Sequence, residues 1–135
     1  MTPKKPRTKD VDKSFYPIFM KRAQECLHAA KYSYKHQEWT SVAISAIHSA
    51  IAACDAICVY FLGQKATGES HNEAIILFKA IDNSKEISTN ANRLAQIIRT
   101  KNIAEYEKRL IFKSEAEKIL SACEKFFEFA KNKLP

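Results

Sequence analysis

The sequence predicts an all-α fold, an antiparallel up-and-down bundle of four main helices and one shorter helix. Apolar residues recur at steps of three and four along most of the chain, which is the helical period. Only two glycines and four prolines interrupt 135 residues, and three of the prolines lie among the first seventeen. No segment alternates apolar and polar residues as a half-buried strand does. Amphipathic helices bury their apolar faces by packing side by side as a bundle.

The domain organisation follows from the length and from the first residues. A chain of 135 residues is long enough for one hydrophobic core and too short for two. Residues 1–13 carry five Lys or Arg against two Asp, and their two prolines discourage helix, so we expect a basic flexible tail. Residues 14–135 should form a single helical-bundle domain. The tail lacks the apolar run of a secretory signal, and we expect a cytoplasmic protein.

The segment Trp39–Leu62 is the most apolar in the chain, and the other helices are expected to pack around it. Its length also matches a bilayer core at about 1.5 Å per residue. Asp55 lies near its middle, where a carboxylate costs about 2.5–3.5 kcal/mol on insertion scales. The central helix of a soluble bundle is therefore favoured over a membrane span, and no membrane partner is expected.

A polar stripe runs along the same helix, because Ser41, Ser45, His48 and Asp55 are spaced so that they share one face. Buried hydroxyl, imidazole and carboxylate groups cost free energy unless each finds a hydrogen-bonding partner. We expect this stripe to be buried against a second chain or against the segment around Arg99.

Four further helices are indicated by apolar faces and by capping residues. Their expected starts, in chain order, are Phe15 or Pro17, Ser70 in a capping box with Glu73, Ser88 or Thr89, and Ser114 in a capping box with Glu117. The first should end near His36, and the short one near Asp82. Gly63 is placed to end the central helix in a left-handed turn. Residues 100–113 lose the helical period, so we expect an irregular segment there.

All four cysteines fall on apolar faces of the expected helices. They are Cys26, Cys54, Cys58 and Cys123. In a cytoplasmic protein this placement favours reduced core thiols over disulfides. The cysteines also lack the closely spaced CxxC pairs of structural zinc sites, so we expect neither a metal ion nor a cofactor.

Positive charge is concentrated in residues 93–113. The whole chain has a net charge of +7, and the basic tail accounts for +3 of it. Residues 93–113 hold six Lys or Arg against two Glu, a net +4, so the remainder of the chain is neutral. Cations gathered on one short irregular segment are typical of a phosphate-binding loop. Ordinary solvated side chains between two helices are the alternative interpretation.

Three patches of sequence resemble the HEPN superfamily, in particular its small stand-alone prokaryotic members. They are AISAIHSAIAACDAICVYFLG at 43–63, GESHNEAI at 68–75 and RTKNIAEYEKRLIFKSEAEKILSACEKFFEF at 99–129. The resemblance covers roughly Phe15 to Leu134. It implies an up-and-down helical bundle, commonly dimeric. It also implies a family that contains metal-independent ribonucleases of toxin and defence systems as well as non-catalytic binding or partner modules.

In catalytic members of that superfamily an Arg is followed, after four to six residues, by a His. Arg99 would begin this motif here, with Asn102 in the usual polar position, but Tyr106 stands in place of the His. The resemblance implies that the Arg holds the scissile phosphate while the His assists proton transfer during attack by the ribose 2′-hydroxyl. A tyrosine hydroxyl titrates near pH 10, so it donates a hydrogen bond at neutral pH but is a poor general base.

The first functional class that follows is a HEPN-like module that binds RNA or a nucleotide without catalysis, because the motif is degenerate. The expected ligand-binding residues are Arg99, Lys101, Asn102, Tyr106 and, from the polar stripe, Asp55.

The second class is a metal-independent ribonuclease with a rearranged site. In it Arg99 would clamp the phosphate, and His48 or His71 would replace the missing histidine as proton carrier. A structural bundle with no ligand is a third possibility. The resemblance further implies a homodimer and a nucleotidyltransferase-type partner protein.

Overall fold

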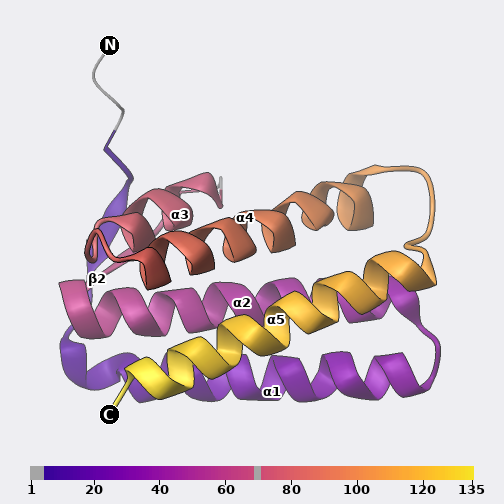
Figure 1. The fold of residues 1–135 in the computed structure, drawn as a ribbon, viewed down its shortest axis with the longest axis horizontal. Helices are drawn as coiled ribbons and strands as arrows, with labels where there is room; N and C mark the ends of the chain where they lie inside the picture. The colour runs from indigo at the N-terminus through magenta and orange to yellow at the C-terminus, as the bar shows by residue number, and fades with distance from the viewer. Residues whose placement is uncertain (1–4, 69–70) are drawn as a thin grey trace.

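The computed structural model describes residues 5–68 and 71–135, and within them the chain folds into five α-helices, a 3₁₀ helix and a two-stranded sheet (Figure 1). In chain order the elements are β1 (Thr8–Asp10), a 3₁₀ helix (Lys13–Phe15), α1 (Tyr16–Lys35), α2 (Trp39–Leu62), β2 (Gln64–Ala66), α3 (Asn72–Lys79), α4 (Lys85–Tyr106) and α5 (Lys113–Lys133). The expected all-α bundle is confirmed, with the small sheet at one end of it.

The central element is α2, which contacts each of the other four α-helices, whereas α1 and α4 have no contact with each other among the described residues. Figure 1 shows α1 along one side of α2, α3 and α4 along the opposite side, and α5 crossing obliquely over α2. By length and composition α2 is apolar enough to cross a membrane, and 72% of its most apolar window is buried in the bundle. Neighbouring helices thus cover most of its apolar surface.

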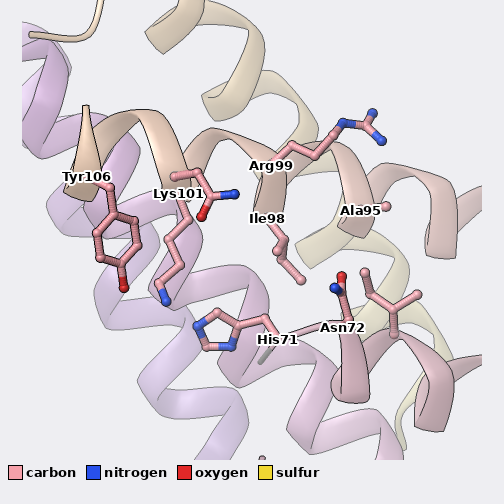
Figure 2. A pocket seen from close by; sticks show the side chains of 9 residues that line it. His71, Asn72, Ala95, Ile98, Arg99, Lys101 and Tyr106 are labelled. Carbon is pink, nitrogen blue, oxygen red and sulfur yellow. The ribbon is translucent and has the colours of Figure 1, made fainter. Parts of the chain in front are cut away.

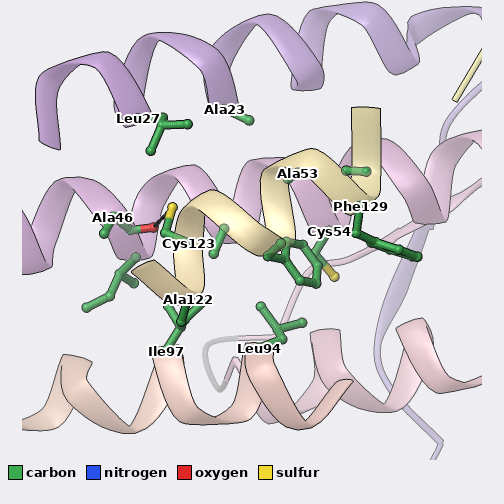
Figure 3. Close-up of a cluster of buried hydrophobic side chains, with 14 of the residues drawn as sticks. Ala23, Leu27, Ala46, Ala53, Cys54, Leu94, Ile97, Ala122, Cys123 and Phe129 are labelled. Carbon is green, nitrogen blue, oxygen red and sulfur yellow. Dashed lines mark hydrogen bonds between the residues drawn. The ribbon is translucent and has the colours of Figure 1, made fainter. Parts of the chain in front are cut away.

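Small side chains and thiols fill the core where α2 meets α1 and α5 (Figure 3). Ala46 and Ala53 of α2 are fully buried, as is Ala23 of α1, so the two helices approach closely. The Cys123 thiol of α5 donates to the Ala46 carbonyl at 3.3 Å, and the Cys54 thiol donates to a carbonyl of α3 at 3.8 Å. All four cysteines are free thiols, and three of them are buried.

The start and the end of α4 differ from the prediction. Ser84, rather than Ser88 or Thr89, caps this helix, because its hydroxyl accepts from the Ile87 amide at 3.1 Å. The helix then continues to Tyr106 through the stretch that was expected to be irregular. The residues of the degenerate motif therefore lie on a helix and not in a loop.

The start of α5 also differs from the predicted capping box. Ser114 lies inside the helix, and Glu115 makes the reciprocal contact of the first turn by accepting from the Phe112 amide at 2.8 Å. Arg109 braces the same carboxylate with two hydrogen bonds at 2.8 and 2.9 Å. This bidentate contact, together with backbone hydrogen bonding, lowers the pKa of Glu115 to about 2.

The N-terminal tail is ordered in part, which corrects the expectation of a flexible leader over residues 1–13. Strand β1 pairs antiparallel with β2, with Lys9 opposite Lys65. A three-residue strand shows too little alternation to be recognised from sequence. Residues 1–4 of the tail and the expected capping residue Ser70 lie outside the described residues. As predicted, Gly63 ends α2 in the left-handed conformation.

Candidate functional site

A groove of about 490 Å³ lies between the first turn of α3 and the C-terminal half of α4 (Figure 2). It is lined by His71, Asn72, Ile75, Ala95, Ile98, Arg99, Lys101, Asn102 and Tyr106. The sequence predicted five of these as site residues, namely His71, Arg99, Lys101, Asn102 and Tyr106. The structure brings these five together.

Helical geometry explains which α4 residues reach the groove. Ala95, Ile98, Arg99, Asn102 and Tyr106 follow one another at steps of three, one, three and four, and so share one face of α4. The apolar wall members of this face were missed in the sequence, because residues 100–113 were not predicted to be helical. Extending the period of α4 through Tyr106 would have identified them.

Asn72 and Ile75 form the opposite wall, on α3. Ile75 is half-buried and packs against the core, while Asn72 is exposed at the first helical position. Contacts between α3 and α4 hold the two walls together. The groove thus has an apolar floor and a polar rim, which is the usual composition of a small-ligand site.

One end of the groove is cationic. Figure 2 shows the Lys101 ammonium directed toward His71, with the Tyr106 ring beside it. Lys101 forms an ion pair with Glu105 at 3.6 Å, and its ammonium lies 6.0 Å from the centre of the Tyr106 ring. Glu105 therefore neutralises part of the charge that Lys101 brings to the groove.

The His71 imidazole is half-buried at this end. Burial lowers its pKa, and the nearby charges of Lys101 and His48 lower it further, while Glu105 acts in the opposite direction. A histidine with a lowered pKa is neutral at pH 7, so His71 can accept a proton or a hydrogen bond there.

Arg99 is exposed on the rim, and in Figure 2 its guanidinium extends toward the side of Ala95, away from His71. Among the described residues no carboxylate lies within 4.0 Å of it. Other cations of residues 93–113 are compensated: Arg109 pairs with Glu115 at 2.8 Å and with a second glutamate at 3.4 Å. The net +4 of this segment is therefore offset at Lys101 and Arg109, and Arg99 is left to interact with a ligand.

Tyr106 is the last residue of α4 and is 71% exposed. Its ring stands at the edge of the groove, where it can stack on a planar ligand or donate a hydrogen bond from its hydroxyl. Asn102 lies one helical turn before it and offers both a donor and an acceptor.

The two remaining candidates lie outside the groove. His48 is exposed on α2, close enough to His71 to affect its pKa. Asp55 is buried and forms an ion pair with Lys65 of β2 at 3.7 Å. Burial raises the pKa of Asp55 to about 6, against the opposing influence of Lys65 and Arg22.

The polar stripe of α2 therefore does not act as one surface. The Ser41 hydroxyl bonds to that of Ser33 on α1 at 2.9 Å, and Asp55 is satisfied by β2. His48 remains exposed within the single chain. None of these three residues lines the groove, so the expectation that the stripe packs against the segment around Arg99 is wrong for Ser41 and Asp55.

The groove's chemistry is that of an anion site. It offers a guanidinium, an ammonium, an amide, a phenol and a neutral imidazole, all of which can donate hydrogen bonds to phosphate oxygens. Within residues 5–68 and 71–135, no three side chains of His, Cys, Asp or Glu converge as metal ligands do.

Comparison with known proteins bears on the same elements. The family model of the HEPN domain matches residues 16–133 of the chain. No match was found among curated proteins. The matched range contains α1 to α5 and so both walls of the groove, whereas β1 precedes it.

Proposed function

The chain belongs to the HEPN family, and from this we propose that it is a HEPN module that binds the phosphate of RNA or of a nucleotide in the α3–α4 groove and cuts RNA slowly or not at all. The observation that supports the proposal most is the meeting of Arg99, Lys101, Asn102 and Tyr106 in one groove with His71.

Binding is supported by the uncompensated guanidinium of Arg99. A planar guanidinium grips two phosphate oxygens at once, and such charge-assisted hydrogen bonds are about twice as strong as neutral ones. The exposed Tyr106 ring gives a base a surface on which to stack. A groove of about 490 Å³ lies within the usual size range of small-ligand sites.

Slow cleavage is supported by the identity of residue 106. The catalytic histidine of the family motif is replaced by Tyr106, whose phenol holds its proton at neutral pH. General acid–base assistance contributes about 10² to 10⁴ to a rate, and that contribution lacks its usual carrier here.

Fluorescence anisotropy with labelled single-stranded RNA tests the binding proposal. We expect Arg99→Ala to weaken binding by about ten-fold or more, the value of a charged hydrogen bond, and the affinity of the wild type to fall steeply with salt. The matched control is Lys21→Ala, which removes one exposed cation from α1 on the other side of α2. Equal losses in the two variants would mean that binding follows net charge and not the groove.

A ribonuclease with a rearranged site is the second candidate, and one observation favours it. The His71 imidazole lines the same groove as Arg99, and its lowered pKa keeps it neutral and able to accept a proton at pH 7. Cleavage of RNA by the wild type that is lost in both Arg99→Ala and His71→Ala would favour this candidate over the binding module. Cleavage that survives His71→Ala would direct attention to His48, which lies beside it.

A further inference from the structure

Glu73 occupies the first turn of α3, directly after Asn72 and two residues after His71, which both line the groove. Its carboxylate accepts two hydrogen bonds from Arg7, one from the backbone amide at 3.1 Å and one from the guanidinium Nε at 3.2 Å. The Glu73 side chain is only 13% exposed. The wall of the groove is therefore tied to the N-terminal segment through a largely buried carboxylate.

Arg7 is itself fixed by the sheet. Its carbonyl accepts from the Thr67 amide at 3.0 Å, which continues the β1–β2 ladder by one pair. At the other end of β1, the Val11 amide donates to the Gly63 carbonyl at 2.9 Å. The sheet is in turn held to α2 by the ion pair of Lys65 with Asp55. A continuous set of contacts thus runs from the central helix through the sheet to α3.

The loop before α3 is shaped around the same carboxylate. A Cβ placed on Gly68 would overlap the carboxylate of Glu73, so a side chain at this position would displace it. Glycine therefore allows the loop to pass close over Glu73.

α3 needs such an anchor because it has only eight residues, too few to be stable as an isolated helix. Its later residues are held by the core, where the Phe78 ring lies 5.6 Å from Phe126 and 5.9 Å from Phe129. Its first turn, which carries the groove residues, has the Arg7–Glu73 contact instead. The HEPN match begins at residue 16, so β1 and Arg7 lie before the matched domain.

We propose that the segment from Arg7 to Val11 is a strap that fixes the α3 wall of the groove, with Arg7 and Glu73 as positioning residues. The importance of the wall for a ligand rests on the proposed function, whereas its fixation by the strap is a property of the free protein. Removing Arg7 leaves the carboxylate of Glu73 without two hydrogen bonds, and the first turn of α3 then opens more often.

Hydrogen exchange of the full chain, followed amide by amide, tests the strap. We expect Arg7→Ala to lower the protection of α3 amides by about ten-fold while α5 amides keep theirs, because a largely buried acceptor loses its donors locally. The control Lys9→Ala removes a cation from the exposed strand β1 and should leave α3 unchanged. Unchanged α3 protection in Arg7→Ala, or an equal loss in α3 and α5, would overturn the proposal.

The His71 titration by NMR gives a readout that a purely structural role would not move. In Glu73→Ala the loss of a negative charge by itself would lower the pKa of His71, whereas loosening of the wall exposes the ring and raises that pKa toward its ordinary value. We expect a rise in Glu73→Ala and no change in Lys9→Ala; a fall in Glu73→Ala would contradict the strap. Neither readout uses RNA, so absence of RNA binding would overturn only the proposed function.

Discussion

Tyr106 is the residue at which the groove departs from a catalytic HEPN arrangement, because a proton carrier titrating near neutrality is replaced by a phenol. Its exposure leaves room for another side chain at the end of α4. Tyr106→His restores an imidazole at the motif position, and we expect it to raise RNA cleavage by about 10²-fold or more. The control Tyr106→Phe removes only a hydroxyl and should leave cleavage unchanged. Cleavage rates of a defined RNA measured with equal protein concentrations check both variants, and an inactive Tyr106→His would contradict the role assigned to this position.

Asp55 makes the stability of the protein depend on pH. Its pKa is raised to about 6 in the folded state and lies near 4 in the unfolded state. The folded state therefore holds the proton over a window where the unfolded state releases it, so this stabilising contribution is present below about pH 4 and is lost as the pH rises through 6. Up to about 3 kcal/mol is linked to this proton.

Asp55→Asn removes that linkage while keeping the shape of the side chain. We expect the free energy of unfolding of the wild type, relative to that of the variant, to fall between pH 4 and pH 7 by an amount within this bound. Urea unfolding at several pH values measures it. Asp10→Asn, on the exposed strand β1, serves as the control. A difference between wild type and Asp55→Asn that stays constant over this window would show that Asp55 is not the linked group.

At the scale of elements, α4 decides both the fold and the site. Its start could not be chosen from sequence, because Ser84, Ser88 and Thr89 are all capping types. The structure selects Ser84, whose amide is held by the Asp82 carboxylate at 2.8 Å. We expect Ser84→Ala to lower the free energy of unfolding by about 1 kcal/mol, whereas Ser88→Ala should change it by less than about 0.5 kcal/mol. Urea unfolding of the two variants checks this, and the reverse order would place the cap at Ser88.

The end of α4 was unpredictable for a different reason. Beyond Ile98 only half-buried apolar residues remain, Ile103 and Ala104, so the helical period that a core imposes is weak there. The site residues Arg99, Lys101 and Asn102 could be named from the charge and from the family motif, but not their placement on a helix face. The α3 wall could not be foreseen, since it depends on contacts distant in sequence.

At the scale of the whole molecule, the bundle was predictable because its signal is strong and local. α1 and α2 begin and end within one or two residues of the expected positions, where apolar periodicity and Gly63 define them. The β1–β2 pairing was missed, because its two strands are three residues each and separated by more than fifty positions. Local sequence cannot report a pairing of that kind.

We propose that the protein assembles as a homodimer and that a nucleotidyltransferase-type protein is its partner, on the family resemblance. The exposed His48 on the polar stripe of α2 gives the dimer a test at one residue. Multi-angle light scattering at high micromolar concentration should give twice the monomer mass of 15.4 kDa. A monomeric mass would count against the dimer and would leave the groove as a site within a single chain.

The central claim is that the α3–α4 groove binds RNA phosphate without efficient cleavage. The most direct test is to titrate single-stranded RNA into the isotope-labelled wild-type protein, to follow backbone amide shifts, and to recover the RNA afterwards. The account predicts that the largest shifts fall on Asn72, on residues 98–102 and on Tyr106, with the RNA recovered intact. Shifts that are absent there, or that gather on α1 at the far side of α2, would contradict the claim.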